Sequence, residues 1–185
     1  MTYYRFQSII KESVGVLIFC SLIAVLTGQV LYSMQDQFIA IPIFLVCVPV
    51  INSLGGNLGS IFGARITSAL HLGSIASVSD EELHKNVAMS VILGVFVYGF
   101  LAILIYGVSP FLDLEITIDV MNFLAIFIFS GVILTIGVMC IILVTAFLSF
   151  KRGIDPDNTV IPVVTTLGDS LGIMSLVSMI WVIGI

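Results

Sequence analysis

The stretch VMNFLAIFIFSGVILTIGVMCIILVTAFLSF, residues 120–150, contains no charged side chain. A helix needs about 20 apolar residues to cross roughly 30 Å of hydrocarbon, so this stretch is long enough to span a membrane. It lacks the alternation of apolar and polar residues, about ten residues at a time, that is typical of strands in a membrane β-barrel. The stretch therefore predicts a transmembrane helix.

Four further apolar windows surround this stretch. They cover residues 13–35, 37–64, 86–112 and 158–185, and only the last contains a charge. The chain is 59% hydrophobic and 9% charged, whereas soluble domains are roughly 25% charged. We expect an all-α integral membrane protein with five transmembrane helices, at approximately 14–32, 39–72, 87–108, 120–150 and 159–184. Residues 1–185 would form a single membrane domain without a cytoplasmic regulatory domain.

The positions of the basic residues predict how the helices are oriented. These residues precede the first window, or lie around the connections between the second and third and between the fourth and fifth: Arg5, Lys11, Arg65, Lys85, Lys151 and Arg152. The connections around Asp36 and across residues 110–119 contain none. Because cytoplasmic loops are enriched in Lys and Arg, we expect a cytoplasmic N-terminus and an external C-terminus, in the plasma membrane.

The second window is unusually long and contains helix-breaking residues. Its helical pattern continues from about Ile39 to Leu72, roughly 50 Å at 1.5 Å per residue. Pro42, Pro49 and the Gly-rich run at 52–60 interrupt it. A broken helix is tolerated at membrane depth where the freed carbonyls are buried in protein or line a wet cavity. We expect a helix that is tilted, broken or projecting into the cytoplasm.

Asp169 is the only charged residue inside any of the five windows. If Asp157 or Asn158 caps the last helix, Asp169 lies about eleven residues in, or roughly 16 Å along the axis, near the middle of the hydrocarbon core. A carboxylate there costs roughly 2.5–3.5 kcal/mol and indicates a functional site. The alternative is a protonated acid that forms a structural hydrogen bond.

Other polar side chains accompany this acid. Thr165 and Thr166 precede Asp169 by four and three residues, so they share its side of a helix. Hydroxyls beside a carboxylate suit a hydrated cation, although Thr also bonds back to the preceding turn of its own helix. Asn52 and Asn57 flank the glycines of the second helix. The amide oxygen of Asn57 would line an ion exit or bond between helices.

Glycines recur in both polar segments and allow helices to approach one another closely. They are Gly55, Gly56, Gly59, Gly168 and Gly172. Rows of small residues four apart are typical of packed membrane helices. Helix packing is the favoured interpretation of these glycines, and lining of a pore is the alternative.

The sequence contains no motif for a soluble activity. It has no Gly-rich phosphate loop, catalytic triad or metalloprotease spacing, and no polybasic stretch. We therefore expect neither an enzyme nor a nucleic-acid partner, and no prosthetic group.

Two segments, PVINSLGGNLGSIFGARITSALHLG at 49–73 and IDPDNTVIPVVTTLGDSLGI at 154–173, together resemble the membrane domain of the MgtE family of magnesium channels and its eukaryotic solute-carrier relatives. They look like the family's "GGN.G" and "DP....P..TT..D..G" patterns. The resemblance implies a homodimer of parallel protomers in the lipid bilayer. A pore on the twofold axis would be lined by helices two and five, and Asp169 matches the pore aspartate. The transported ion would be Mg²⁺, with Mn²⁺ or Co²⁺ also possible.

The sequence also departs from the family pattern. Bacterial members carry large N-terminal cytoplasmic domains, whereas about a dozen residues precede the first helix here, and Ser60 occupies a position that is often Gln. Eukaryotic relatives fuse two such membrane domains, so this chain looks like one half that dimerises. Two alternatives to a channel stay open. In the first, the chain is an exchanger that is coupled to H⁺ or Na⁺ and uses Asp169. In the second, the chain is a membrane assembly subunit that transports nothing.

Overall fold

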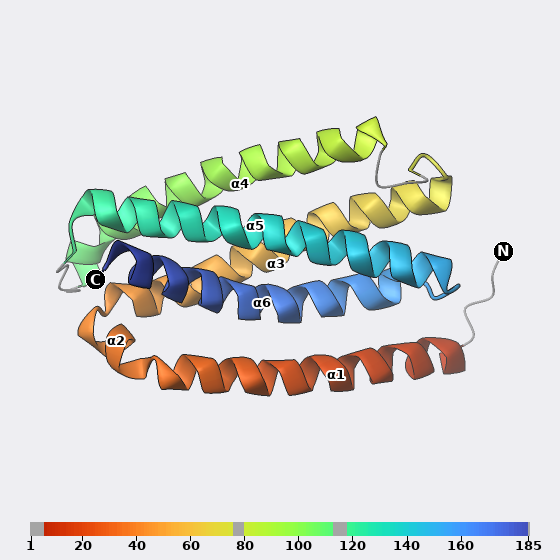
Figure 1. Cartoon of the computed structure of the whole chain (residues 1–185), viewed down its shortest axis with the longest axis horizontal. Helices are drawn as coiled ribbons and strands as arrows, with labels where there is room; N and C mark the ends of the chain where they lie inside the picture. Colours follow the sequence, from red (N-terminus) through yellow and green to blue (C-terminus); the bar gives the residue numbers. More distant parts are fainter. Residues whose placement is uncertain (1–5, 76–79, 113–117, 185) are drawn as a thin grey trace.

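The computed structural model describes residues 6–75, 80–112 and 118–184, and this part of the chain contains helices and no β-strand (Figure 1). The elements are α1 (Phe6–Ser33), α2 (Gln35–Ala40), α3 (Ile43–Leu72), α4 (Glu81–Val108), the short 3-10 helix η1 (Ser109–Leu112), α5 (Val120–Lys151) and α6 (Pro156–Ile183). Helices α1, α3, α4, α5 and α6 are long and apolar enough to cross a membrane. The predicted all-α membrane fold with five spanning helices is confirmed.

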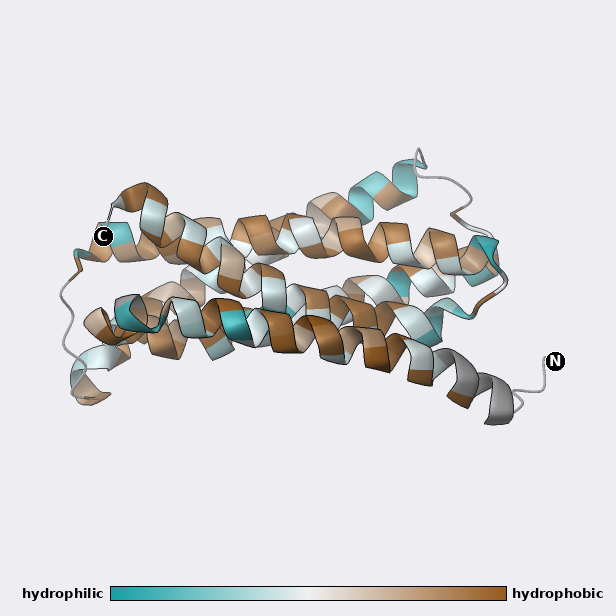
Figure 2. Ribbon diagram, turned by 60° about the horizontal axis from the view of Figure 1, so that its bottom comes forward, coloured by the Kyte–Doolittle hydropathy of each residue, from teal (hydrophilic) through white to brown (hydrophobic). Residues whose placement is uncertain are grey.

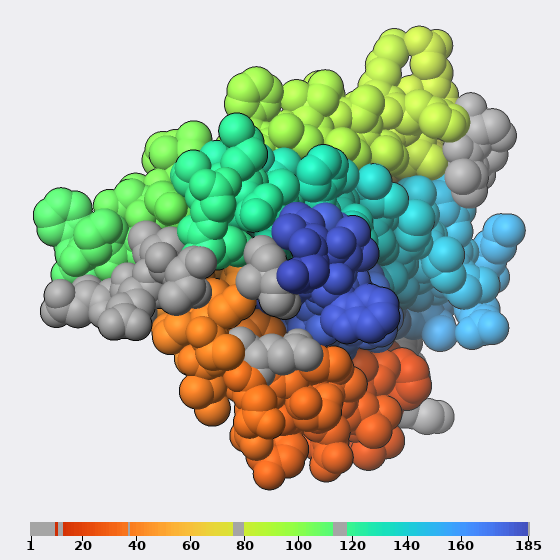
Figure 3. Space-filling view, turned by 60° about the vertical axis from the view of Figure 1, so that its left-hand side comes forward, coloured from red at the N-terminus to blue at the C-terminus, as the bar shows by residue number. Residues whose placement is uncertain are grey.

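Helices α5 and α6 form the centre of the bundle. Helix α6 packs against α5, α3 and α1, while α4 packs on the far side of α5. Figure 3, seen from the end where α6 finishes, shows α6 (blue) between α5 (green to teal) and the orange helices from the start of the chain. Half of the residues in the most apolar window of α5 (50%) are buried, whereas only 6% of those in the corresponding window of α1 are buried. Helix α1 is therefore peripheral.

The surface of the bundle is suited to a bilayer. Most hydrophilic residues gather at its two ends, and apolar residues make up most of the length between them (Figure 2). Many large apolar side chains are exposed, among them Phe96, Phe100 and Ile103 on α4. Burying this surface in lipid removes it from water, and burial contributes about 25 cal/mol per Å² of apolar area. The chain is thus a multi-pass membrane protein.

Helix α3 shows which of the expected forms the second helix takes. It is a continuous helix from Ile43 to Leu72 that passes through Pro49 and the Gly-rich run without a break, and the short α2 precedes it. An interruption therefore occurs at Pro42, between α2 and α3, but none occurs at Pro49 or in the Gly-rich run, and the rest of the predicted segment is one long helix. Glycine has a low helix propensity, but tertiary packing overrides propensity, and several of these glycines lie against side chains of α5 and α6. Gly73, with φ +71°, ends the helix.

Helix α6 begins earlier than the sequence suggested. Its cap is Asp155, whose Oδ1 accepts a hydrogen bond from the Asp157 backbone N–H at 3.0 Å. The expectation that Asp157 or Asn158 caps the helix is therefore wrong. Pro156 provides the reason, because its fixed φ suits the first helical position and its missing N–H is not needed there.

Candidate cation site on α6 and α3

Asp169 lies halfway along a spanning helix and on the surface of the chain. Asp169 is the fourteenth of the 28 residues of α6, and it is exposed. It forms no hydrogen bond or ion pair with any residue that the structure describes. A helix centred on the bilayer would therefore place an unpartnered carboxylate near the midplane.

The neighbours of α6 define the face on which Asp169 lies. Val164 and Gly172 lie against α3, whereas Pro162 and Ser170 contact α1. At 3.6 residues per turn, Asp169 falls between these two strips. Its carboxylate therefore lies on the outward side of α6, in the gap between α1 and α3.

The two threonines have different surroundings. The partly buried Thr165 donates its hydroxyl to the backbone oxygens of Ile161 and Pro162, both at 3.1 Å. Bonding back to the preceding turn therefore occurs, but it uses the hydroxyl hydrogen and leaves oxygen lone pairs able to face a cation or its water. Thr166 is also partly buried. It is four residues from both Pro162 and Ser170, so it lies on the strip that contacts α1.

Two asparagines of α3 lie near the same level. Asn57 is exposed, and Asn52 is partly buried and lies against Gly172. The Asn52 side-chain oxygen is buried and has no hydrogen-bond partner in the described part of the chain. Because Gly172 is three residues from Asp169 on α6, this oxygen lies within about one helical turn of the level of the carboxylate. A buried acceptor without a partner is rare, and an ordered water is the usual way in which such a group is satisfied.

Two glycines of α3 serve helix packing. A Cβ at Gly55 would come within 2.6 Å of Leu134 Cδ2 on α5, and a Cβ at Gly59 within 2.5 Å of Val164 on α6 and 2.7 Å of Val138 on α5. Real Cβ atoms essentially never approach so closely. These two positions therefore require glycine for the three helices to meet.

The remaining glycines of the predicted set have other roles. Gly172 makes room for the Asn52 side chain, and Gly168 has only ordinary contact with Val138, at 3.5 Å. No described residue lies within 4 Å of the position that a Cβ would take at Gly56. Of the five, Gly56 alone faces open space, so it is the one that fits the lining of a pore.

A second polar cluster lies where α3 ends and α6 begins, and the sequence alone gave no role to its histidine. His71 Nε2 lies 3.7 Å from Asp155 Oδ1, and the potential ligand atoms of His71, Asp155 and Asp157 all lie within 4.8 Å of one another. Alternating helix directions bring these two helix ends to one side of the bundle. The pair places the end of α3 beside the cap of α6.

Comparison with known proteins identifies the family. Residues 48–179 match MgtE, described as a divalent cation transporter. Solute carrier family 41 member 2 of Gallus gallus is 30% identical over 157 residues, which cover 76% of this chain and 27% of that protein. Solute carrier family 41 member 3 of Mus musculus is 29% identical over 142 residues, covering 69% of this chain and 29% of that protein.

The chain spans less than a third of the length of these curated relatives. No solved structure matches it. The family match extends over most of the chain and includes α6 almost to its end, with Asp169 inside it. The chain belongs to the MgtE family of divalent cation transporters.

Proposed function

We propose that this chain transports divalent cations, Mg²⁺ foremost, through a pore between two parallel copies in the plasma membrane, with cytoplasmic N-termini. Helices α3 and α6 of both copies would line the pore. The observation that carries the proposal is the exposed carboxylate of Asp169 at the middle of a spanning helix, where no described residue bonds to it. Membership of a family of divalent cation transporters supports the choice of cargo.

Electrostatics favours a pair of these carboxylates around a cation. An ionised group that faces lipid is costly, so acids within membrane helices face the interior of an assembly or a wet cavity. A twofold axis beside the α1–α3 gap would bring two Asp169 side chains together. Two carboxylates in one site repel unless they are protonated or bridged by a cation.

The remaining oxygens suit a hydrated ion. Mg²⁺ prefers oxygen ligands, keeps several waters and is held by one or two carboxylates. Thr165, Asn57 and the buried oxygen of Asn52 would hold those waters, and Thr166 would do so from the side nearer α1. Mn²⁺ and Co²⁺ accept the same kinds of ligand, so we expect them to compete with Mg²⁺.

Flux into proteoliposomes tests the proposal. The variants are Asp169→Asn and, as a matched control, Glu81→Gln, which removes an exposed carboxylate paired with Lys85 at 2.8 Å. We expect Mg²⁺ uptake driven by an imposed membrane potential in the wild type and in the control. Asp169→Asn should reduce the uptake by about tenfold or more, which corresponds to about 1.4 kcal/mol.

Other outcomes separate the alternatives. Flux that requires an opposing H⁺ or Na⁺ gradient would make the chain a coupled exchanger. No flux under any gradient, together with stoichiometric co-purification of another membrane protein, would make it an assembly subunit. Uptake that is equal in the wild type and Asp169→Asn would contradict the site.

A further inference from the structure

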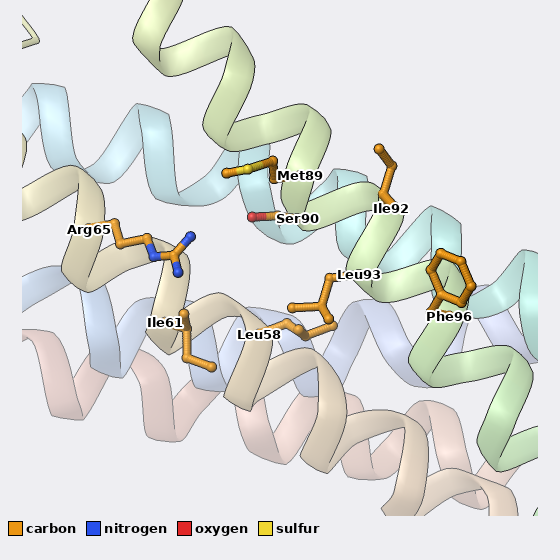
Figure 4. A pocket seen from close by; sticks show the side chains of 8 residues that line it. All are labelled: Leu58, Ile61, Arg65, Met89, Ser90, Ile92, Leu93 and Phe96. Carbon is orange, nitrogen blue, oxygen red and sulfur yellow. The ribbon is translucent and has the colours of Figure 1, made fainter.

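Helices α3 and α4 enclose a groove on the surface of the bundle (Figure 4). Its volume is about 400 Å³, and its lining is apolar except for Arg65 and Ser90. In Figure 4, Leu58 of α3 and Leu93 of α4 point toward one another, and Arg65 extends from α3 into the space between the helices. The groove is therefore an apolar surface depression, and the cationic side chain of Arg65 lies at its edge.

A second, polar pocket lies on the other side of Arg65. It has a volume of about 430 Å³, and it is more polar than the groove. Arg65 lines it together with four polar residues, Ser68, Ser74, Glu82 and Asn86, and three apolar ones, Ala64, Ala69 and Leu72. Arg65 is thus shared by a polar pocket and an apolar groove. The polar pocket would accommodate the head group of a phospholipid, and the adjoining apolar groove would accommodate an acyl chain.

The level of Arg65 agrees with the head-group region of a bilayer. Because Gly172 of α6 lies against Asn52 of α3 and the two helices are antiparallel, Asp169 is level with about residue 55. Arg65 lies ten residues further along α3, or about 15 Å. With Asp169 at the midplane, this is the edge of a hydrocarbon core about 30 Å thick.

The charges around the polar pocket indicate which type of phospholipid head group would fit it. Arg65 forms no ion pair or hydrogen bond with any residue that the structure describes, and a guanidinium matches the geometry of a phosphate. Glu82 lines the same pocket and would repel a head group that carries only negative charge. A head group with both a phosphate and a primary ammonium complements both side chains.

We propose that the α3–α4 groove binds an aminophospholipid of the phosphatidylethanolamine type. Its phosphate contacts Arg65, its ammonium contacts Glu82, and one acyl chain lies along Leu58, Ile61 and Leu93. Pockets between membrane helices that contain a basic residue on the cytoplasmic side are a known type of lipid site. The end of α3, with Arg65, and the start of α4, with Glu81, Glu82 and Lys85, lie on the side that the positive-inside rule assigns to the cytoplasm.

Lipid retention measures this binding without relying on transport. The full chain is reconstituted with equal parts of phosphatidylethanolamine, phosphatidylcholine and phosphatidylglycerol, extracted in mild detergent, and analysed by native mass spectrometry for bound lipids. The variants are Arg65→Gln, Arg65→Lys and Glu82→Gln. The control, Arg152→Gln, removes an exposed cation that does not line either pocket.

We expect the wild type and the control to retain phosphatidylethanolamine in preference to the other two lipids. Arg65→Gln should lower this retention by about tenfold or more, as expected for a charge-assisted hydrogen bond, and Arg65→Lys should restore part of it. Glu82→Gln should abolish the preference over phosphatidylglycerol. Equal retention of all three lipids by the wild type would overturn the proposal. So would unchanged retention in Arg65→Gln, or disulfide cross-linking of Leu93→Cys to a second copy, which would assign the groove to a protein interface.

Discussion

Gly56 and Gly59 are three residues apart on α3, yet their surroundings differ. A Cβ at Gly59 would come within 2.5 Å of Val164 and 2.7 Å of Val138, whereas nothing lies within 4 Å of a Cβ at Gly56. A methyl group at residue 59 must displace side chains of two other helices. A methyl group at residue 56 enters open space and improves helix propensity.

We therefore expect Gly59→Ala to lower the free energy of unfolding by about 1–3 kcal/mol, the usual cost of overpacking. Gly56→Ala should leave the stability of the isolated protomer unchanged or raise it by up to about 1 kcal/mol. The apparent melting temperature of the purified variants in detergent, followed by circular dichroism, measures both. Equal losses in the two variants would contradict the packing described for α3.

The sequence is sufficient to identify Asp169 but not its surroundings. A lone charge in an apolar window is visible without any coordinates, because its cost in lipid is large. The buried oxygen of Asn52 acquires its meaning only from Gly172, which is 120 residues away and makes room for it. Likewise, His71 meets Asp155 only because α3 ends where α6 begins. Contacts between distant segments do not show in a local pattern.

At the scale of elements, the apolar windows predicted the five helices well, whereas the terminal turns and the course of α3 were harder to predict. The glycines of α3 indicate a break when considered alone. Side chains of α5 and α6 lie against Gly55 and Gly59, however, and the helix continues through the Gly-rich run. The start of α6 was placed too late because Asp157 and Asn158 are also residue types that cap helices. The pair Asp155 and Pro156 forms the start of the helix instead.

The cap of α6 yields a prediction at this scale. Asp155→Ala removes the acceptor of the 3.0 Å bond from the Asp157 N–H and should cost about 0.5–2 kcal/mol. Asp155→Asn keeps a side-chain oxygen that caps equally well, so it should retain most of the stability, with a smaller loss from the helix dipole of about 0.3–1 kcal/mol. Thermal unfolding of both variants in the same detergent measures the difference. If Asn is as damaging as Ala, the charge and its pairing with His71 stabilise α6 more than the cap does.

At the scale of the whole molecule, the single chain leaves Asp169, halfway along a spanning helix, exposed. Apolar residues make up most of the surface along the length of the bundle (Figure 2). Exposing Asp169 to lipid would cost roughly 2.5–3.5 kcal/mol, and a second copy that covers the α1–α3 gap would remove this cost. Assembly and transport would then depend on the same face of the protomer.

Cross-linking tests this arrangement. Asn57 is exposed on α3, and Cys140 is exposed on α5, which packs on a different side of α6 from Asp169. In a chain without Cys20 and Cys47, the variant with Asn57→Cys and Cys140→Ala should form a covalent dimer with thiol reagents of some spacer length, because residue 57 would lie beside the twofold axis. The matched variant that keeps Cys140 and Asn57 should stay monomeric on denaturing gels, because its thiol would face lipid away from the axis. Cross-linking through Cys140 but not through residue 57, at every spacer length, would place the dimer interface on α5 and separate Asp169 from it.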